Sequence, residues 1–359
     1  MRIALAAGGT GGHILPALVV WEHLSRTVPG SEARFFGPDD RGERSLVEPA
    51  VPFVTIPAAP VRGRTPPALA RNLLRIAKGV IRARRALAEF DPQVVFSTGG
   101  YGSFPTVLAA KLLRLPVVVY LPDVAPGLAV RVERWLADRI GTSTEGALAH
   151  LPRRKTVVTG YPVRDAFWSL TRADARRSLG IGEEPLLLVA GATQGAHAIN
   201  AAVFEAVEAL CRASVLFHIT GPRDIAAAES LRASLPAQLR DRYRPAAYRR
   251  DLPTLMLAAD LGIMRAGASV LGELPAAGLP AILVPGTYAG GHQRENARWL
   301  AEAGAAVVLE ERELAELPGL ALELLADRER LRRMSEAARR LARPDAAERL
   351  ARLLTEVAA

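Results

Sequence analysis

The sequence predicts an α/β protein of two Rossmann-like domains, because each half of the chain opens with an apolar run, a glycine-rich turn and a helix. The first copy is residues 3–7 followed by Gly8 through His13, and the second is residues 186–190 followed by Gly191 through His197. Such a turn directs unpaired backbone N–H groups and the positive end of a helix dipole at one point, which suits a phosphate. The chain of 359 residues is also longer than one core normally organises. We therefore expect two similar domains facing a cleft that holds a nucleotide.

Apolar runs typical of β-strands alternate with helical stretches in both halves, which is the pattern of parallel sheets. In the first half, strands are predicted at residues 2–6, 33–36, 53–56, 94–97, 117–120, 140–142 and 156–158. In the second half, they are predicted at residues 186–190, 216–220, 244–246, 261–263, 281–284 and 306–309.

The domain boundary is predicted at Gly160 through Arg164, which lies between the two sets of strands. We expect an N-terminal domain at residues 1–160 and a C-terminal nucleotide-binding domain at residues 161–340. The tail is almost wholly helical and is broken at Pro344. Residues 341–359 are therefore assigned to a last helix, expected to pack back on the N-terminal domain.

The cysteine count excludes a disulfide-stabilised protein, and the hydropathy of the longest uncharged run excludes a membrane-spanning helix there. The single cysteine, Cys211, permits no disulfide framework and no sulfur metal site, and its apolar surroundings favour a small core residue. The longest uncharged run, residues 274–291, is interrupted by three prolines and cannot form a membrane-spanning helix.

The positive charge of the chain is concentrated in its first half. Residues 1–160 carry 21 basic against 12 acidic side chains, whereas residues 161–359 carry 25 of each. Residues 67–88 are predicted to form a helix with one apolar face. The apolar positions are Leu69, Leu73, Ile76, Val80, Ala83 and Leu87, and the basic positions on the opposite face are Arg71, Arg75, Lys78, Arg82 and Arg85.

A basic stripe of this kind is a solvated surface, a nucleic-acid footprint or a contact to an anionic membrane. Nucleic acid is disfavoured, because no aromatic residues are interleaved with the basic ones and no helix-turn-helix signal is present. Leu74, Ile81 and the apolar loop at residues 57–61 favour the membrane. The solvated surface stays open as the alternative.

Common nucleotide motifs do not fit the turns. The dinucleotide fingerprint would start at Gly9 but meets Ile14 where its third glycine belongs. No Gly-Lys-Ser/Thr sequence and no Asp-x-Asp pair is present. A diphosphate leaving group would therefore be neutralised by backbone N–H groups, hydroxyls and arginine, and no metal or cofactor is expected.

Candidate donor-site residues occur in several turns of the second half. Thr193, Gln194 and Gly195 lie in its first turn, and Arg164 lies in the connection. Glu273 follows a third glycine-containing turn, where a carboxylate could accept hydrogen bonds from two ribose hydroxyls or simply complement its helix N-terminus. His292 and Gln293, with Asn296, follow a Gly/Pro-rich loop.

These motifs in this order resemble the MurG family of bacterial peptidoglycan glycosyltransferases, which have the GT-B fold. The matching segments are Gly8–His13 with Pro16, Gly99–Tyr101 with Pro105, Gly160–Arg164, Thr193–Ala196 with Asn200, Arg265–Glu273 with Ala277–Pro280, and His292–Gln293 with Asn296. The resemblance implies inverting transfer of N-acetylglucosamine from UDP-GlcNAc to the C4 hydroxyl of the N-acetylmuramoyl sugar of undecaprenyl-linked lipid I, giving lipid II. It also implies a peripheral protein on the cytoplasmic face of the plasma membrane, whose N-terminal domain, residues 1–160, faces the acceptor and the membrane. Thr10, Gly11 and Gly12 are then expected at the UDP-GlcNAc site and Tyr101 on the acceptor side.

The sequence departs from the family pattern at three places. Tyr120-Leu121-Pro122-Asp123 stands where His-Glu-Gln-Asn is usual, so the expected acceptor-side carboxylate is missing or displaced to Asp123. Thr193 keeps the hydroxyl of a usual serine, and Tyr161 replaces an asparagine.

Inverting transfer needs a base that takes the acceptor proton. His13 is the first candidate because imidazole titrates near neutrality, and Asp123 is the second. A histidine that only hydrogen-bonds within its turn is the structural alternative. A UDP-GlcNAc 2-epimerase of the same fold and a non-catalytic protein that binds membranes or polyanions remain as other classes.

Overall fold

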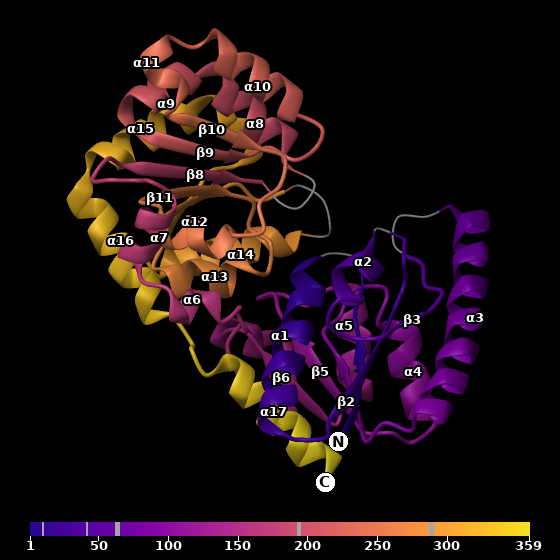
Figure 1. Cartoon of the computed structure of the whole chain (residues 1–359). Helices are drawn as coiled ribbons and strands as arrows, with labels where there is room; N and C mark the ends of the chain where they lie inside the picture. Colours follow the sequence, from indigo (N-terminus) through magenta and orange to yellow (C-terminus); the bar gives the residue numbers. More distant parts are fainter. Residues whose placement is uncertain (9–10, 41, 62–64, 192–194, 287–290) are drawn as a thin grey trace. The chain divides into compact units, whose positions relative to one another are not determined.

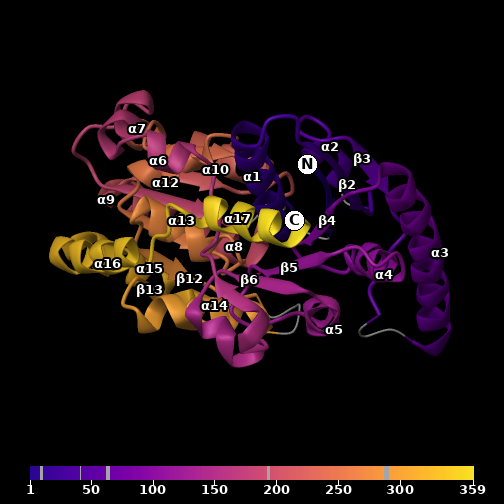
Figure 2. The ribbon, with the colours of Figure 1, turned by 90° about the horizontal axis from the view of Figure 1, so that it is seen from below.

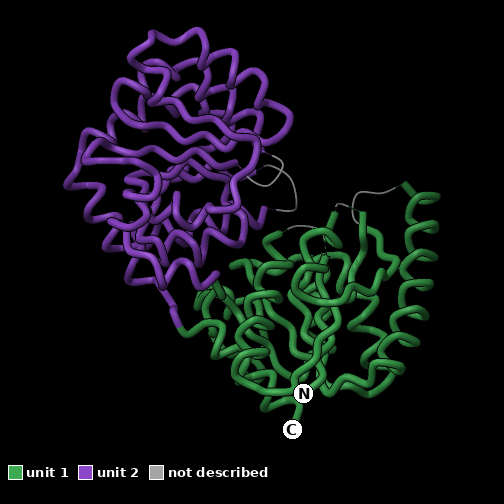
Figure 3. Tube along the Cα trace, in the orientation of Figure 1, with its two compact units in different colours: residues 1–163, 345–359 green, residues 164–344 purple. Residues whose placement is uncertain are grey.

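The computed structural model describes residues 1–8, 11–40, 42–61, 65–191, 195–286 and 291–359. The chain divides into two compact units (Figure 3). Unit 1 contains residues 1–163 and 345–359, and unit 2 contains residues 164–344. The chain thus returns to unit 1 for its last helix, α17 (Ala346–Ala358).

Within the described residues, unit 1 contains a parallel sheet of seven strands in the order β3-β2-β1-β4-β5-β6-β7. The strands are β1 (Arg2–Ala6), β2 (Glu32–Gly37), β3 (Phe53–Thr55), β4 (Val94–Ser97), β5 (Val117–Leu121), β6 (Arg139–Thr142) and β7 (Thr156–Val158). Each strand predicted in the first half is present with its ends shifted by at most one residue. From β1 the next strands in the chain, β2 and β3, lie on one side, whereas β4 to β7 lie on the other, so the strand order reverses between β1 and β4. Ligands bind at such a point in open α/β sheets.

Helices cover both faces of the unit 1 sheet (Figures 1 and 2). Side chains of β1 alternate, so Ile3 and Leu5 pack with α1 (Gly11–Thr27) and α17, whereas Ala4 and Ala6 face α3 (Pro66–Phe90), α4 (Phe104–Leu112) and α5 (Leu128–Leu136). The shorter helices are α2 (Glu43–Val47), η1 (Glu145–His150) and η2 (Arg153–Lys155). In α17, Leu350, Leu353 and Leu354 are buried in the core with β1.

The predicted amphipathic helix is α3, but its apolar face is buried only in its second half. Ala83 and Leu87 are fully buried, whereas Leu73 is 52% exposed. The helix backbone meets the preceding loop at Gly79, where an added Cβ would lie 2.0 Å from the Pro57 carbonyl oxygen. Leu73 precedes this contact point, so the predicted apolar face begins before the part of the helix that unit 1 covers.

Within the described residues, unit 2 contains a six-stranded parallel sheet in the order β10-β9-β8-β11-β12-β13. The strands are β8 (Leu186–Ala190), β9 (Val215–Ile219), β10 (Tyr243–Ala246), β11 (Leu261–Met264), β12 (Ala281–Leu283) and β13 (Ala306–Val308). They confirm the strands predicted in the second half, again with shifts of at most one residue at either end. The chain-order reversal falls between β8 and β11.

Helices also cover both faces of the unit 2 sheet. One core contains side chains of α8 (His197–Glu205), α9 (Val207–Ala213) and α15 (Leu317–Ala326), and Cys211 is buried in it. The other face carries α12 (Leu252–Ala258) and α13 (Val270–Ala277), as Figure 1 shows. The remaining helices are α6 (Ala166–Ser169), α7 (Arg172–Ser178), α10 (Ile225–Ser234), α11 (Ala237–Arg240), α14 (His292–Glu302), η4 (Glu311–Glu316) and α16 (Arg328–Arg340).

No helix in the described part of the chain combines the length and the apolar character needed to cross a bilayer.

Candidate functional site

The site of unit 1 lies where the turns after β1 and β4 pack backbone against backbone. Gly100 has a φ of 82°, and a Cβ there would lie 1.9 Å from the Gly8 carbonyl oxygen. Gly102 also approaches this turn, because its added Cβ would lie 2.9 Å from the Gly8 Cα. Only glycine permits this approach, so the two glycine motifs form one surface at the carboxyl edge of the sheet. Gly11 and Gly12 begin α1 beside it, whereas Thr10 lies outside the described residues.

His13 is held in this surface by two hydrogen bonds to Thr98. The His13 Nδ1 lies 2.9 Å from the Thr98 carbonyl oxygen, and the Thr98 hydroxyl donates to the His13 carbonyl oxygen at 2.5 Å. A carbonyl oxygen only accepts, so Nδ1 of the neutral ring carries the hydrogen. In this tautomer the Nε2 atom carries a free lone pair, as a general base requires.

Tyr161 supports the start of α1. Pro16 lies inside this helix and has no N–H group, so the Gly12 carbonyl oxygen lacks its usual partner four residues on. The Tyr161 hydroxyl donates to that oxygen at 3.1 Å. The tyrosine that departs from the family pattern therefore has a structural function beside His13.

Tyr101 and Asp123, the residues predicted on the acceptor side, follow neighbouring strands. Tyr101 is half-buried in the turn after β4, and Asp123 is buried just after β5. Nearby Tyr120 donates to the Gly160 carbonyl oxygen at 3.0 Å, and its pKa is raised by burial and by the charges of Tyr161 and Asp123. Both predicted residues thus belong to the carboxyl edge of the unit 1 sheet.

Glu133 is a buried acid that the sequence analysis missed. It lies on α5, is fully buried, and accepts hydrogen bonds from Ser97 at 2.7 Å and Ser103 at 2.6 Å. Burial raises the pKa of Glu133 to about 7, although the two serine hydrogen bonds oppose the shift. The helical spacing of Val130, Glu133 and Ala137 was the available signal, because it places the acid on the buried face.

The site of unit 2 lies after β8, β11 and β12, which are neighbours in the sheet. Gly195 has a φ of 78°, and a Cβ there would lie 2.1 Å from the Thr220 carbonyl oxygen. This contact requires glycine and presses the turn after β8 against the end of β9. Thr193 and Gln194 of the same turn lie outside the described residues.

Glu273 and Arg164 are brought together in unit 2. The Arg164 guanidinium lies 3.7 Å from the Glu273 Oε1 and donates to the Arg250 carbonyl oxygen at 3.4 Å. Burial raises the pKa of Glu273, whereas the charge of Arg164 and a hydrogen bond with Ser269 oppose the shift. A buried carboxylate beside a cation is a strong acceptor for hydroxyl groups.

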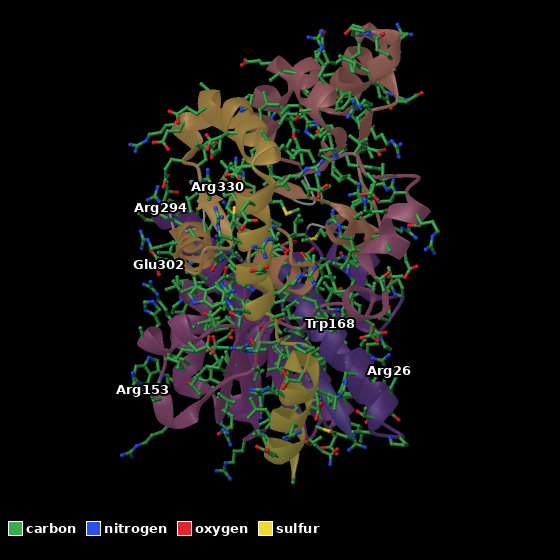
Figure 4. All side chains as sticks on the ribbon, turned by 90° about the vertical axis from the view of Figure 1, so that its left-hand side faces the viewer. Arg26, Arg153, Trp168, Arg294, Glu302 and Arg330 are labelled. Carbon is green, nitrogen blue, oxygen red and sulfur yellow. The ribbon has the colours of Figure 1, made fainter. Side chains whose placement is uncertain are left out.

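The start of α14 connects the two loops that follow β11 and β12. Gln293 accepts from the Gly286 N–H at 2.8 Å, and Asn296 donates to the Ala266 carbonyl oxygen at 3.0 Å. Arg294, labelled in Figure 4, donates to both carboxylate oxygens of Glu310, from Nε at 3.1 Å and from Nη2 at 2.8 Å. His292, the first residue of α14, is thereby placed at the same edge of the sheet.

A chain of hydrogen bonds, also missed from the sequence, leads from the start of α8 into the core of unit 2. His197 lies 3.0 Å from Asp224, which accepts from Asn200 at 2.7 Å. Asn200 in turn lies 3.0 Å from His218, whose other nitrogen lies 3.1 Å from the Tyr243 hydroxyl. Burial lowers the pKa of His218 to about 3, so this histidine is neutral within the core of unit 2.

The basic stripe is exposed on α3 of unit 1. Arg71, Lys78, Arg82 and Arg85 are exposed, and within the described residues only Arg75 of the stripe has an acidic partner, Asp40, at 2.7 Å. Leu74 and Ile81 are 66% and 56% exposed and, seven residues apart, lie within the stripe.

The loop before α3 does not supply the apolar surface that the sequence suggested. Ala58 and Ala59 are buried, and Asn72 donates to the Pro60 carbonyl oxygen at 2.8 Å. The expectation that residues 57–61 form part of a membrane contact is therefore wrong for these two alanines, because their side chains are buried inside unit 1.

Two family models match the chain. The glycosyltransferase family 28 N-terminal domain matches residues 3–142, and the C-terminal domain of the same family matches residues 186–350. These ranges correspond to most of unit 1 and most of unit 2.

Curated relatives match nearly the whole chain. A "UDP-N-acetylglucosamine--N-acetylmuramyl-(pentapeptide) pyrophosphoryl-undecaprenol N-acetylglucosamine transferase" from Roseiflexus sp. (strain RS-1) is 37% identical over 99% of this chain and 94% of its own length. A protein of the same name from Acidothermus cellulolyticus is 39% identical over 100% of this chain and 98% of its own length.

Solved structures give the same fold. MurG from Acinetobacter baumannii superposes with a TM-score of 0.75 at 26% identity and covers 99% of both chains. A UDP-GlcNAc 2-epimerase from Neisseria meningitidis, bound to UDP-GlcNAc, has a TM-score of 0.68 at 16% identity over 99% of this chain and 100% of its own.

Proposed function

The chain belongs to the MurG family of glycosyltransferase family 28, with two Rossmann-like domains of the GT-B class, and from this membership we propose that it makes lipid II. The enzyme transfers N-acetylglucosamine from UDP-GlcNAc to the C4 hydroxyl of the N-acetylmuramoyl sugar of lipid I, with inversion. The observation that carries this proposal is the identity to curated transferases along almost the full length of both chains.

The donor half of the proposed reaction belongs to unit 2. Glu273 accepts hydrogen bonds from the ribose hydroxyls, since its buried carboxylate lies near the carboxyl edge of the unit 2 sheet and 3.7 Å from the Arg164 guanidinium. Arg164, which lies 3.7 Å from that carboxylate, supplies positive charge for the diphosphate. Gln293 and His292 bind from the start of α14, and the turn containing Thr193, Gln194 and Gly195 surrounds the phosphates with N–H groups.

The acceptor half belongs to unit 1, and His13 is its base. The Nε2 lone pair takes the proton of the C4 hydroxyl while that oxygen attacks the anomeric carbon and UDP leaves from the opposite face. The Thr98 carbonyl oxygen stabilises the resulting imidazolium by accepting from Nδ1. Tyr101 and the glycine turns contact the acceptor, and Asp123 is the alternative base.

The basic stripe of α3 seats unit 1 on the cytoplasmic face of the plasma membrane, where the acceptor lipid resides. Exposed arginines and lysine attract anionic headgroups, and Leu74 and Ile81 supply aliphatic side chains that enter the interface. Arg75 contributes least, because Asp40 already neutralises it.

The epimerase alternative rests on fold alone, since the epimerases are at most 18% identical to this chain. The two functions differ in what consumes the donor. A transferase releases UDP only when lipid I accepts the sugar. An epimerase needs no lipid and inverts C2 of the donor sugar, which gives either the UDP-linked epimer or, where water cleaves the bond to UDP, free N-acetylmannosamine and UDP. Coupled measurement of UDP release with and without lipid I, at equal donor concentration, tests the proposal: release that does not depend on the lipid contradicts it.

A further inference from the structure

We propose that Glu133 is a positioning residue for the transfer reaction, which holds the turn after β4 through Ser97 and Ser103 and thereby holds His13. The inference rests on the proposed function, because it assigns the turn and His13 to the acceptor side. Glu133 itself touches neither substrate nor the reacting atoms in this account.

Glu133 reaches the turn from beneath, through one hydroxyl at each end. The Ser97 hydroxyl donates to the Glu133 Oε2 at 2.7 Å, and its oxygen accepts from the Gly99 N–H at 3.3 Å. At the other end of the turn, the Ser103 oxygen lies 2.6 Å from the Glu133 Oε1 and 2.9 Å from the Gly100 carbonyl oxygen. One carboxyl group therefore fixes both ends of the turn.

His13 depends on the same turn. Its Nδ1 hydrogen bond ends on the Thr98 carbonyl oxygen, which lies between Ser97 and Gly99 in the chain. A Cβ added to Gly99 would lie 2.8 Å from the Val130 side chain of α5 and 3.6 Å from the His13 Nδ1. A small displacement of the turn would therefore turn the imidazole ring and misdirect its Nε2 lone pair.

The protonation state of Glu133 changes how many hydrogen bonds hold the turn. The Ser103 hydroxyl has one hydrogen and two acceptors within reach. When Glu133 is ionised, that hydrogen goes to the carboxylate, and the Gly100 carbonyl oxygen loses the hydroxyl. When Glu133 is protonated on Oε1, it donates to the Ser103 oxygen, and the Ser103 hydroxyl donates to Gly100. The protonated form thus adds a hydrogen bond to the turn.

Charged groups on the surrounding elements have other partners. On α5, Arg131 donates to the Pro126 carbonyl oxygen and Arg134 donates to the His150 carbonyl oxygen. On α4, Lys111 pairs with Asp138 at 2.9 Å. The titratable group that α1 presents to the turn is His13 itself. Strand β4 has no titratable residue, and β5 turns its apolar Val117, Val119 and Leu121 toward this core.

The proton of Glu133 therefore titrates within the range where the enzyme is assayed, because burial raises its pKa to about 7. The wild-type enzyme is expected to show an acceptor KM that rises as the pH increases through neutrality. The donor KM is expected to stay unchanged, because the donor residues belong to unit 2.

Steady-state kinetics with lipid I, from about pH 6 to about pH 9, test the proposal through the variants Glu133→Gln and Glu133→Ala. Glutamine donates to Ser103 and accepts from Ser97, as protonated Glu133 does, so its acceptor KM is expected to be low and independent of pH. Alanine is expected to raise the acceptor KM about tenfold at every pH, the scale of one lost buried hydrogen bond, and to leave UDP affinity unchanged. Glu22→Gln, an exposed acid of α1, is the matched control.

Two results would overturn the proposal. One is an acceptor KM in Glu133→Gln that keeps the wild-type pH dependence, and the other is an alanine variant with wild-type kinetics. Because the glutamine variant preserves shape, the test does not depend on the alanine variant folding. If the wild-type enzyme itself releases no UDP in the presence of lipid I, the proposed function fails instead, which separates the two outcomes.

Discussion

At the scale of single residues, the proposed acceptor side is organised around the tautomer of His13. The Thr98 carbonyl oxygen selects the form with a lone pair on Nε2, and the Thr98 hydroxyl returns a hydrogen bond to the backbone of His13. The free lone pair that the proposed base needs therefore follows from a backbone contact that the sequence motif alone does not reveal.

His13→Ala is expected to lower turnover about 10²–10⁴-fold, the usual contribution of a general base. UDP affinity is expected to stay within error of the wild type, because the donor residues lie in unit 2. Turnover with saturating lipid I and calorimetric titration with UDP measure the two quantities. If Asp123→Asn lowers turnover more than His13→Ala does, Asp123 is the base.

Glu273→Gln is expected to weaken UDP binding by about 1.5–3 kcal/mol, the range for hydrogen bonds to a charged group. The glutamine keeps the shape of the side chain but removes the charge that accepts from the ribose hydroxyls. Calorimetry gives the change, and Glu302→Gln, an exposed acid at the end of α14, is the control (Figure 4). Unchanged affinity in Glu273→Gln would remove this residue from the donor site.

Glu133 is expected to make folding stability depend on pH. The folded-state pKa of about 7 lies above the ordinary value of 4.5, so between these values the folded protein keeps a proton that the unfolded chain has lost. Stability contributed by that proton is present below about pH 4.5 and is lost as the pH rises to about 7, on the order of 3 kcal/mol in all.

Urea unfolding of the wild type and Glu133→Gln, at several pH values between about 5 and about 8, measures how the free energy of unfolding changes with pH. The variant is expected to lose less stability between about pH 5 and about pH 8 than the wild type does. An equal loss in both proteins would show that Glu133 is not protonated in the folded state at acidic pH.

At the scale of elements, the strands were predictable because apolar runs bounded by glycine and proline mark buried parallel strands. The contacts of α3 were less predictable, because periodicity shows which residues share a face but not where along its length a helix is covered. Leu73 is exposed for this reason, and the Arg75–Asp40 pair joins residues 35 positions apart. Glu133 was missed because a charged residue on a helix normally faces water.

The basic stripe of α3 gives a prediction at this scale. Replacing Arg71, Lys78, Arg82 and Arg85 by serine is expected to release the protein from anionic vesicles, since each basic residue contributes about 1 kcal/mol near such a surface. Adding Arg75→Ser is expected to change little, because Asp40 already pairs with Arg75. Leu74→Ser with Ile81→Ser is expected to weaken binding at constant charge.

Vesicle co-sedimentation measures the binding, and salt near 0.1 M, where the Debye length is about 10 Å, is expected to weaken it. Removal of four exposed arginines of α16, namely Arg328, Arg332, Arg333 and Arg340, gives a control of equal charge in unit 2. Binding that persists in the four-residue α3 variant and at high salt would identify the stripe as a solvated surface.

At the scale of the whole molecule, the two units have the same architecture and different surfaces. Each places its glycine turns at the reversal of strand order, which is where open α/β sheets bind ligands. The excess positive charge lies in residues 1–160, whereas residues 161–359 are balanced. This asymmetry was visible in the sequence. A last helix on the N-terminal domain was also expected from the sequence, and α17 lies in the core of unit 1.

The fold alone does not determine the reaction, because transferases and epimerases share it. The full-length relatives favour the transferase, and we propose His13 in unit 1 as its base and Glu273 in unit 2 as its ribose-binding residue. A test of the central claim must therefore follow the sugar itself and not only the loss of the donor.

The most direct measurement incubates the full-length protein with UDP-GlcNAc labelled in its sugar and with lipid I, and then separates lipid from water-soluble products. The account predicts that the label enters the lipid fraction as a β-linked N-acetylglucosamine on C4 of the muramoyl sugar, with one UDP released for each sugar transferred. Label recovered instead as free N-acetylmannosamine, with none in the lipid, would contradict it.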